Sequence, residues 1–286
     1  MVHKEHRLFR QWLLHYEPIV GRENMYVILH GGDPEIYRMA EGCRTIYAPR
    51  RKVDWRFDRQ RFELLNTYAN FLIGNYECVI GGDVDELVFC DPAVSDTLLD
   101  YLSTFRHHPI LFTFGFHVVH HPDEPALDDR ATALKQRRFA VPDSDYCKPL
   151  VTFQEPKWSR GFHATGHQPF LPDHLFMAHL RCVDAEIAND TAEKRKETAT
   201  TSGNLGNTAK QRFWNAHDTI FRRLSRKVIK SQAKAFDEAA PDLIANLRSN
   251  IVSNHANRGG YSMQFVDIPA GVLRLPERFS SSGSKV

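Results

Sequence analysis

Two aspartates, Asp83 and Asp85, stand directly after a short apolar run, and Gly81 and Gly82 join the run to them. Residues two apart in an extended chain point the same way, so both carboxylates can reach one cation or one ligand edge. Hard cations such as Mn²⁺ and Mg²⁺ favour one or two carboxylates, with phosphate oxygens and water completing the shell. The glycines would let the backbone bend and a ligand approach closely. The segment therefore predicts a site for Mn²⁺ or Mg²⁺.

The same pattern also has a plain structural interpretation. At an aspartate frequency of roughly 6%, about one D-x-D is expected by chance in a chain of this length. A second copy, Asp143-Ser-Asp145, follows Val141-Pro142 instead of a buried strand, and it is interpreted as a solvated loop. A simple acidic turn is therefore the alternative to a metal site at Asp83 and Asp85.

Histidines are concentrated late in the chain. Four of them fall within seventeen residues, namely His163, His167, His174 and His179. The last lies in the strand-like run 175–180, which would hold its imidazole rigidly, either for a ligand or as a core histidine bonded to backbone. His163 and His167 have the spacing of a zinc pair, but Gly166 and Pro169 disfavour the helix that such a pair needs.

Hydrophobic periodicity indicates which elements position these groups. Apolar residues at three-to-four spacing predict helices over 8–16 and 62–72, and Asp33-Pro34 predicts the start of a third helix, ending near Glu41. Short apolar runs predict strands at 25–29, 45–48, 78–80, 111–119, 149–153 and 175–182. This alternation predicts an α/β fold with a mostly parallel central sheet flanked by helices. In such sheets, ligands bind at the carboxyl ends of the strands.

Composition narrows the class of protein. The 286 residues carry a formal charge of +2, so no global field favours nucleic acid as a partner. The five cysteines are scattered singly, which argues against a disulfide framework and for a reducing compartment. The N-terminus is too charged to open a secretory signal, and the longest apolar run is shorter than the ~20 residues of a membrane helix. We expect a cytoplasmic protein, with contact at the inner membrane face left open.

The chain is expected to divide into a nucleotide-binding and catalytic domain at 1–185, a basic helical C-terminal region at 186–279 and a disordered tail at 280–286. Residues 190–236 hold eleven Lys and Arg against four Asp and Glu. This stretch is interpreted as a solvated helix face, with contact to donor phosphates or an anionic membrane surface as the alternative. Nucleic acid is disfavoured because aromatic side chains are few there.

The segment from Asp83 to Glu86, followed by two apolar residues and Asp91-Pro92, resembles the D-x-D segment of GT-A glycosyltransferases, in the family 2-like group. The resemblance covers about residues 4–185. Its other parts are Lys4-Glu5, Asp33, Gln60, Asn66, Lys148-Pro-Leu-Val151, His163 and His179. The chain departs from the family at Lys4, where asparagine is usual, and in having only Met1-Val2-His3 before it, where the family has a strand.

This resemblance implies a GT-A-like domain that binds a nucleotide-sugar donor. Asp33 and Asn66 would lie near the nucleoside, with Glu5 also at the donor, and Asp83 near the ribose or the metal. Asp85 and His179 would hold Mn²⁺ or Mg²⁺. A positive charge could come from Lys148, for which a structural surface role is the alternative.

The function that follows is a metal-dependent glycosyltransferase that moves a sugar to a glycan or lipid-linked acceptor, with inversion implied by the resemblance. An inverting transfer needs a carboxylate to take the acceptor proton. Asp123, Glu124 and Glu155 are unranked candidates, and each is alternatively a solvated loop acid. Two other classes stay open: a metal-dependent phosphoesterase with two metals about 4 Å apart, and a non-catalytic nucleotide-sugar-binding protein with a decayed site.

Overall fold

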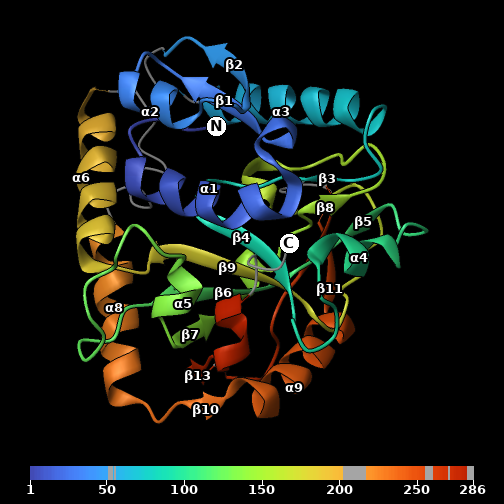
Figure 1. Ribbon diagram of the computed structural model, residues 1–286. Helices are drawn as coiled ribbons and strands as arrows, with labels where there is room; N and C mark the ends of the chain where they lie inside the picture. Colours follow the sequence, from blue (N-terminus) through green and yellow to red (C-terminus); the bar gives the residue numbers. More distant parts are fainter. Residues whose placement is uncertain (51–53, 55, 202–216, 255–259, 270, 282–286) are drawn as a thin grey trace.

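The computed structural model describes residues 1–50, 54, 56–201, 217–254, 260–269 and 271–281. The chain is a mixed α/β protein whose largest sheet has six strands (Figure 1). In spatial order these strands are β10 (Lys234–Ala235), β13 (Leu273–Arg274), β7 (Phe139–Pro142), β6 (Phe114–Val119), β9 (Leu175–Cys182) and β4 (Glu86–Cys90).

The expectation of a mostly parallel sheet is wrong for this large sheet. The β6–β9 and β10–β13 pairs are parallel, and the other three pairs are antiparallel. Every residue of β4, β6 and β9 is buried. Such continuously buried strands are typical of parallel sheets. Here they arise because a mixed sheet is covered on both faces, and burial carries no information on strand direction.

Three smaller sheets complete the strands. β1 (Tyr26–His30) pairs in parallel with β2 (Arg44–Ala48), and the backbone of Val2 bonds to both Ile28 and His30 beside β1. The short strands of the second sheet lie antiparallel in the order β3 (Val79–Ile80), β8 (Val151–Thr152) and β5 (Ile110–Leu111). β11 (Ile251–Asn254) and β12 (Gly260–Met263) form an antiparallel pair.

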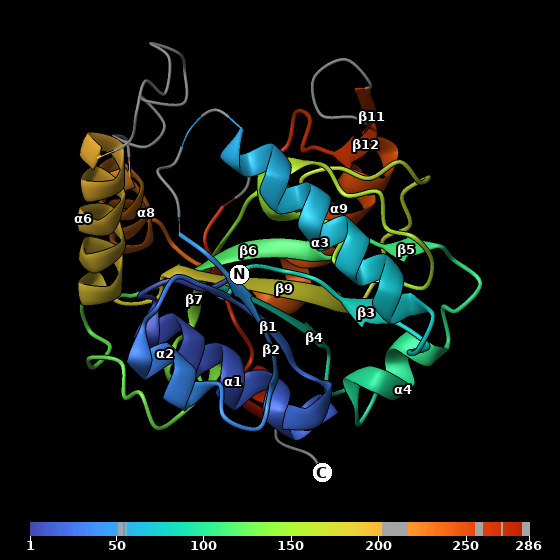
Figure 2. The same cartoon turned by 90° about the horizontal axis from the view of Figure 1, so that it is seen from above.

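The expected helices are present. α1 (His6–Val20) turns an apolar stripe toward the core, and α2 (Pro34–Met39) begins at Asp33, whose carboxylate accepts bonds from two backbone amides of its first turn. α3 (Phe57–Ile73) lies on the opposite side of the strands from α1 and α2 when the molecule is seen from above (Figure 2). Two short helices follow, α4 (Leu98–Ser103) and α5 (Ala133–Gln136). Within the described residues the remaining helices are α6 (Ala185–Thr201), α8 (His217–Lys230) and α9 (Phe236–Ser249), with the 3₁₀ turns η1 (Arg22–Asn24), η2 (Ser144–Tyr146), η3 (Arg160–Phe162) and η4 (Glu277–Ser281).

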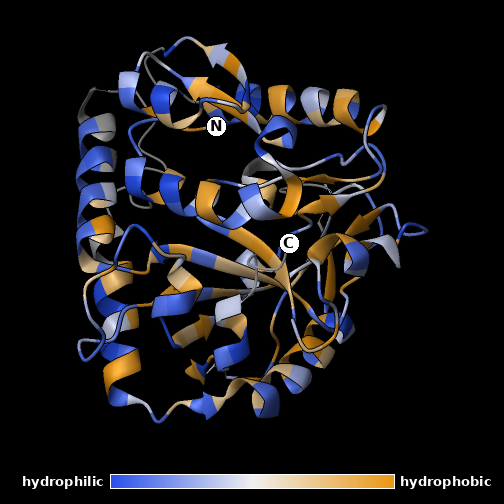
Figure 3. Cartoon of the chain, in the orientation of Figure 1, coloured by the Kyte–Doolittle hydropathy of each residue, from blue (hydrophilic) through white to orange (hydrophobic). Residues whose placement is uncertain are grey.

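The region after residue 185 is built into the same core as the region before it. One apolar cluster extends from Val2 to Phe279, and β10 and β13 are strands of the large sheet. Hydropathy shows the same organisation, since the central strands are mostly apolar and α6 is mostly polar (Figure 3). The expected boundary at 185 therefore does not divide the hydrophobic core, and the C-terminal region is not purely helical.

Part of the expected disordered tail belongs to a 3₁₀ turn. Ser280 and Ser281 belong to η4, whereas 282–286 lie outside the described residues, as do 202–216 of the basic stretch. α6 stands at one edge of the molecule with α8 packed beside it (Figures 1 and 2). Among the described residues, no helix combines the length and apolar character needed to cross a membrane.

Candidate functional site

A polar cavity of about 350 Å³ surrounds the turn between β3 and β4 that carries Asp83, Asp85 and Glu86. Its walls come from the chain before α1, the end of β1, the start of α3, and from β9 and α6. The described residues that line it include His3, Lys4, Glu5, His30, Arg50, Arg61, Tyr146, Lys148, His163, His179, Arg181, Thr191 and Lys194.

Asp85 and His179 meet in this cavity. In the antiparallel β4–β9 register, Glu86 lies opposite His179, and the amide of Leu180 donates to the Asp85 carbonyl at 2.7 Å. This register places the His179 Nε2 atom 3.1 Å from a carboxylate oxygen of Asp85. His179 is only 3% exposed, and burial lowers its pKa to about 4 even though Asp85 acts in the opposite direction. Its imidazole is therefore neutral at pH 7, the form that binds metals.

Asp83 is directed to a different partner. The chain turns at residues 84 and 85, so the assumption of an extended D-x-D segment, with both carboxylates on one side, is wrong. The carboxylate of Asp83 forms an ion pair with Arg61 of α3. Burial opposes ionisation of Asp83, but Arg61 and Lys148 outweigh burial and hold the pKa below its usual value. Asp83 is thus a charged neighbour of the Asp85–His179 pair.

Glu86 completes a group of three possible ligands. Single ligand atoms of Asp85, Glu86 and His179 lie within 4.8 Å of one another, and within the described ranges this is the one such group of metal-ligating side chains. The Lys148 ammonium pairs with Glu86, and both side chains are buried. Burial raises the pKa of Glu86 to about 7, although Lys148 opposes this shift. Lys148 thus lines the cavity, and its charge is engaged by a carboxylate.

Behind His179 lies a chain of polar contacts that the sequence did not reveal. His179 Nδ1 is 2.9 Å from Nδ1 of His117 on β6, and His117 Nε2 is 3.2 Å from the Asp143 carboxylate. Asp143 belongs to the second D-x-D pattern, and its role here is structural, so the interpretation as a solvated loop is wrong for this residue.

The number of protons along this row of contacts tests whether a cation fits between Asp85 and His179. The contacts from Asp85 through His179 and His117 to Asp143 number three, and each needs one proton. Without a cation the third contact needs an imidazolium, and burial disfavours one at His179. A cation between Asp85 and His179 replaces the proton there, and the two remaining protons satisfy the other two contacts. The donor set of Asp85 and His179 therefore fits a divalent cation.

Three other residues expected at the donor have structural partners. Asp33 caps α2 and contacts His6 Nε2 at 2.8 Å, and the Asn66 side chain bonds to both backbone groups of Trp158. Neither is among the described residues that line the polar cavity, whereas Glu5 does line it and lies 3.8 Å from Lys194.

The candidate bases lie away from this cavity. The carboxylate of Glu124 accepts bonds from the amides of His121 and Arg138, and the Asp123 side chain is 91% exposed. Glu155 is also exposed, and its carbonyl is within 2.6 Å of His167 Nε2. None of the three acids is found among the described lining residues.

His163 and His167, whose spacing raised the disfavoured alternative of a zinc pair, do not share a site in the described structure. His163 Nδ1 contacts the carbonyl of Asp145 at 2.8 Å, while His167 contacts the carbonyl of Glu155. The two rings thus have separate backbone partners and no common ligand position in the described structure.

The sequence analysis did not identify Arg61, Glu86 and Arg181 as residues of the cavity. It also did not identify His117 and Asp143, which lie behind His179. Glu86 was visible in the D-V-D-E motif, and His117 stands alone in an otherwise apolar run. Arg61 and Arg181 gave no local signal, because their importance depends on which distant segments they meet.

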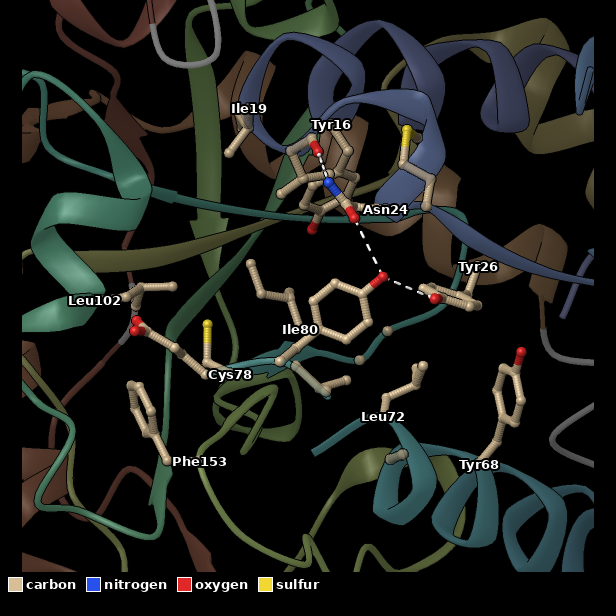
Figure 4. Close-up of a pocket in the computed structure, with 18 of the residues that line it drawn as sticks. Tyr16, Ile19, Asn24, Tyr26, Tyr68, Leu72, Cys78, Ile80, Leu102 and Phe153 are labelled. Atoms are coloured by element: carbon tan, nitrogen blue, oxygen red, sulfur yellow. Dashed lines mark hydrogen bonds between the residues drawn. The ribbon is translucent and has the colours of Figure 1, made fainter. Parts of the chain in front are cut away.

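A second, mostly apolar cavity of about 410 Å³ adjoins the first (Figure 4). Gly82 lines this cavity and Asp83 lines the polar one, so adjacent residues face the two spaces. Its polar atoms are largely paired: the Tyr76 hydroxyl contacts that of Tyr26 at 2.8 Å and donates to Asn24 at 3.2 Å (Figure 4).

Comparison of the chain with known protein families and with curated proteins gives no match. A function for the chain is therefore inferred from the geometry of the site and from the D-x-D resemblance.

Proposed function

We propose that the chain is a metal-dependent glycosyltransferase that moves a sugar from a nucleotide-sugar donor to a glycan or lipid-linked acceptor, with inversion. The supporting observation is the Asp85–His179 pair at 3.1 Å, placed by the β4–β9 register in a cavity rich in basic side chains. An acidic turn alone would not need a buried, neutral histidine on the facing strand.

Asp85 and His179 would hold Mn²⁺ or Mg²⁺, with Glu86 next to them. Such a cation supplies Lewis acidity and neutralises charge on the diphosphate leaving group. The chain adds its own positive charges around this point, from Arg61, Lys148 and Arg181. Arg61 holds the Asp83 carboxylate ionised, and the pairing of Lys148 with Glu86 keeps that side chain in place beside the donor. The apolar cavity next to the turn offers room for an apolar part of a ligand.

In this proposal the proton acceptor is one of the carboxylates that line the cavity, in place of Asp123, Glu124 or Glu155. Glu5, Asp83, Asp85, Glu86 and Glu197 are the described residues of this kind. A base has to reach the acceptor hydroxyl directly or through one water, and Asp123, Glu124 and Glu155 lie outside this space.

The experiment is thermal unfolding of the full chain with UDP, GDP or CMP, each with and without Mn²⁺. A nucleotide at 100 times its Kd adds about 2.7 kcal/mol to the unfolding free energy. We expect one nucleotide to stabilise the wild type only with Mn²⁺, and Asp85→Asn to lose that effect. Asp128→Asn, at an exposed ion pair with Arg130, is the matched control. Stabilisation by Mn²⁺ alone, with turnover of simple phosphate esters, would instead support the phosphoesterase, and no response to any nucleotide would contradict the transferase.

A further inference from the structure

Arg181 is a buried cation without a partner in the described structure. It is 7% exposed, its Nη2 atom has no hydrogen bond, and no carboxylate lies within ion-pair distance of it among the described residues. The other deeply buried arginine, Arg137, shows the usual arrangement, since it bonds to the carbonyls of Val183 and Pro125 and pairs with Asp184. An unpaired charge in the interior costs free energy, so its persistence calls for a partner outside the chain.

The position of Arg181 directs it to the polar cavity. It lies two residues after His179 on β9, in the stretch where the pairing with β6 shifts register. Both side chains line the polar cavity. Thr191 of α6 lines the same cavity, is 4% exposed, and has a hydroxyl that also lacks a partner. A guanidinium and a hydroxyl without partners in the described chain thus belong to two residues that border one cavity.

None of the carboxylates that line the cavity is within ion-pair distance of Arg181 in the described structure. Asp83 pairs with Arg61, Glu86 with Lys148, and Asp85 with His179. Arg181 therefore adds a positive charge that is not in ion-pair contact with any of them. Guanidinium groups bind carboxylate and phosphate with two parallel hydrogen bonds, and a hydroxyl donates to the same oxygens.

We propose that Arg181 and Thr191 form a subsite for an anionic group, phosphate or carboxylate, of the ligand that occupies this cavity. This assignment of a substrate class rests on the proposed transferase function. It implies a substrate that carries a phosphate or carboxylate group bound apart from the metal site. The two sources of such an anion are the diphosphate of the donor and the carboxylate of an acidic sugar.

Binding to the full chain is measured by calorimetry in EDTA, with inorganic pyrophosphate, inorganic phosphate and glucuronate as separate probes. We expect at least one probe to bind, with Arg181→Gln weakening it by tenfold or more and Arg181→Lys by less. Thr191→Val should weaken the same probe by a smaller factor. Pyrophosphate or phosphate binding identifies the donor diphosphate as the source, and binding of glucuronate alone identifies an acidic sugar. Because no metal is present, failure of the metal site leaves this result unaffected.

Stability separates a binding role from a structural one. Without ligand, Arg181→Gln should unfold at the same or a higher temperature than the wild type, since it removes an unpaired buried charge. Arg130→Gln removes the same charge from an exposed loop and should leave both affinity and stability unchanged. The proposal is overturned if no probe binds, if Arg181→Gln binds as well as the wild type, or if this variant unfolds early or fails to fold.

Discussion

At the turn before β4, three neighbouring carboxylates have three different partners. Asp83 meets an arginine of α3, Asp85 a histidine of β9, and Glu86 the buried Lys148. A guanidinium keeps its carboxylate ionised, whereas a neutral imidazole leaves its carboxylate available to a cation. The different environments thus divide structural and ligand-binding roles between residues that are adjacent in sequence.

The buried Glu86–Lys148 pair should show strong energetic coupling. Lys148→Met leaves a buried carboxylate without a cation, and we expect it to lower the unfolding free energy by about 3 kcal/mol at pH 8. Without Lys148 the pKa of Glu86 rises further above that of the unfolded chain, so the folded variant binds a proton more readily and its stability falls as pH rises. Chemical denaturation at pH 6 and pH 8 measures this slope.

The double variant Glu86→Gln with Lys148→Met provides the control. It removes both charges, so it should lose less stability than Lys148→Met and should lack the extra pH slope. Additive losses in the two single variants would show that the pair is not coupled.

His15 predicts a separate pH effect in the core. Its ring is buried, and Nε2 donates to the carbonyl of Val88 at 2.8 Å. Burial lowers the pKa to about 4, below the usual value near 6.5 in the unfolded chain. Between these values the unfolded state binds more protons, so the unfolding free energy falls as pH drops from 6.5 to 4, by up to about 3 kcal/mol.

His15→Gln keeps a donor for the Val88 carbonyl and removes the titration. Denaturation at pH 7 and pH 4.5 should show a smaller loss of stability for the variant than for the wild type. Since His30 and His179 are present in both proteins, the difference between the two slopes reports His15. Equal slopes would mean that His15 is protonated in the folded chain.

At the scale of the elements, strand register assembles the candidate site. His179 on β9 lies opposite Glu86 of β4 on one side and His117 of β6 on the other. A shift of one residue in either pairing would move every side chain of the shifted strand to the other face. The site thus depends on three strands that are far apart in the sequence.

His117 should act as a positioning residue for His179. When His117 Nδ1 accepts the Nδ1 proton of His179, the tautomer is fixed and Nε2 faces Asp85. We expect His117→Phe to weaken Mn²⁺ binding by about 10- to 100-fold, as is usual for loss of such supporting groups. Titration followed by electron paramagnetic resonance measures this affinity without reference to catalysis.

His108→Phe is the control for His117→Phe, since its ring stacks on Phe170 outside the cavity. Its Mn²⁺ affinity should match that of the wild type. Unchanged affinity in His117→Phe would instead restrict the histidine contact to a packing role.

Local signals in the sequence were enough to predict several elements. The apolar stripe of α1, the Asp33-Pro34 cap of α2 and the run that becomes β9 each depend on residues close in sequence, and the structure confirms them. The proximity of Asp85 and His179 was also expected, through the D-x-D resemblance. Strand directions, the His117–His179 contact and the Arg61–Asp83 pair could not be predicted, because long-range pairing leaves no mark on local periodicity.

At the scale of the whole molecule, the C-terminal segment closes over the sheet that carries the site. Arg278 donates to Asp91, just after β4, at 2.7 and 2.9 Å, and also contacts Asp237 of α9. Phe279 is 1% exposed, with its ring centre 5.0 to 5.4 Å from those of Phe89, Phe176 and Phe236. The last described turn is therefore tied to β4, β9 and α9 together.

This arrangement predicts that the chain unfolds as one cooperative unit. Phe279→Ala should lower the unfolding free energy by about 3–5 kcal/mol, because it opens a cavity among three aromatic rings of β4, β9 and α9. The exposed Phe71→Ala, on α3, should change it by less than about 1 kcal/mol and serves as the control. Calorimetry should show a single transition that moves to lower temperature in Phe279→Ala. Two transitions, of which only one responds to the substitution, would mean that residues after 185 fold apart from the strands that hold Asp85 and His179.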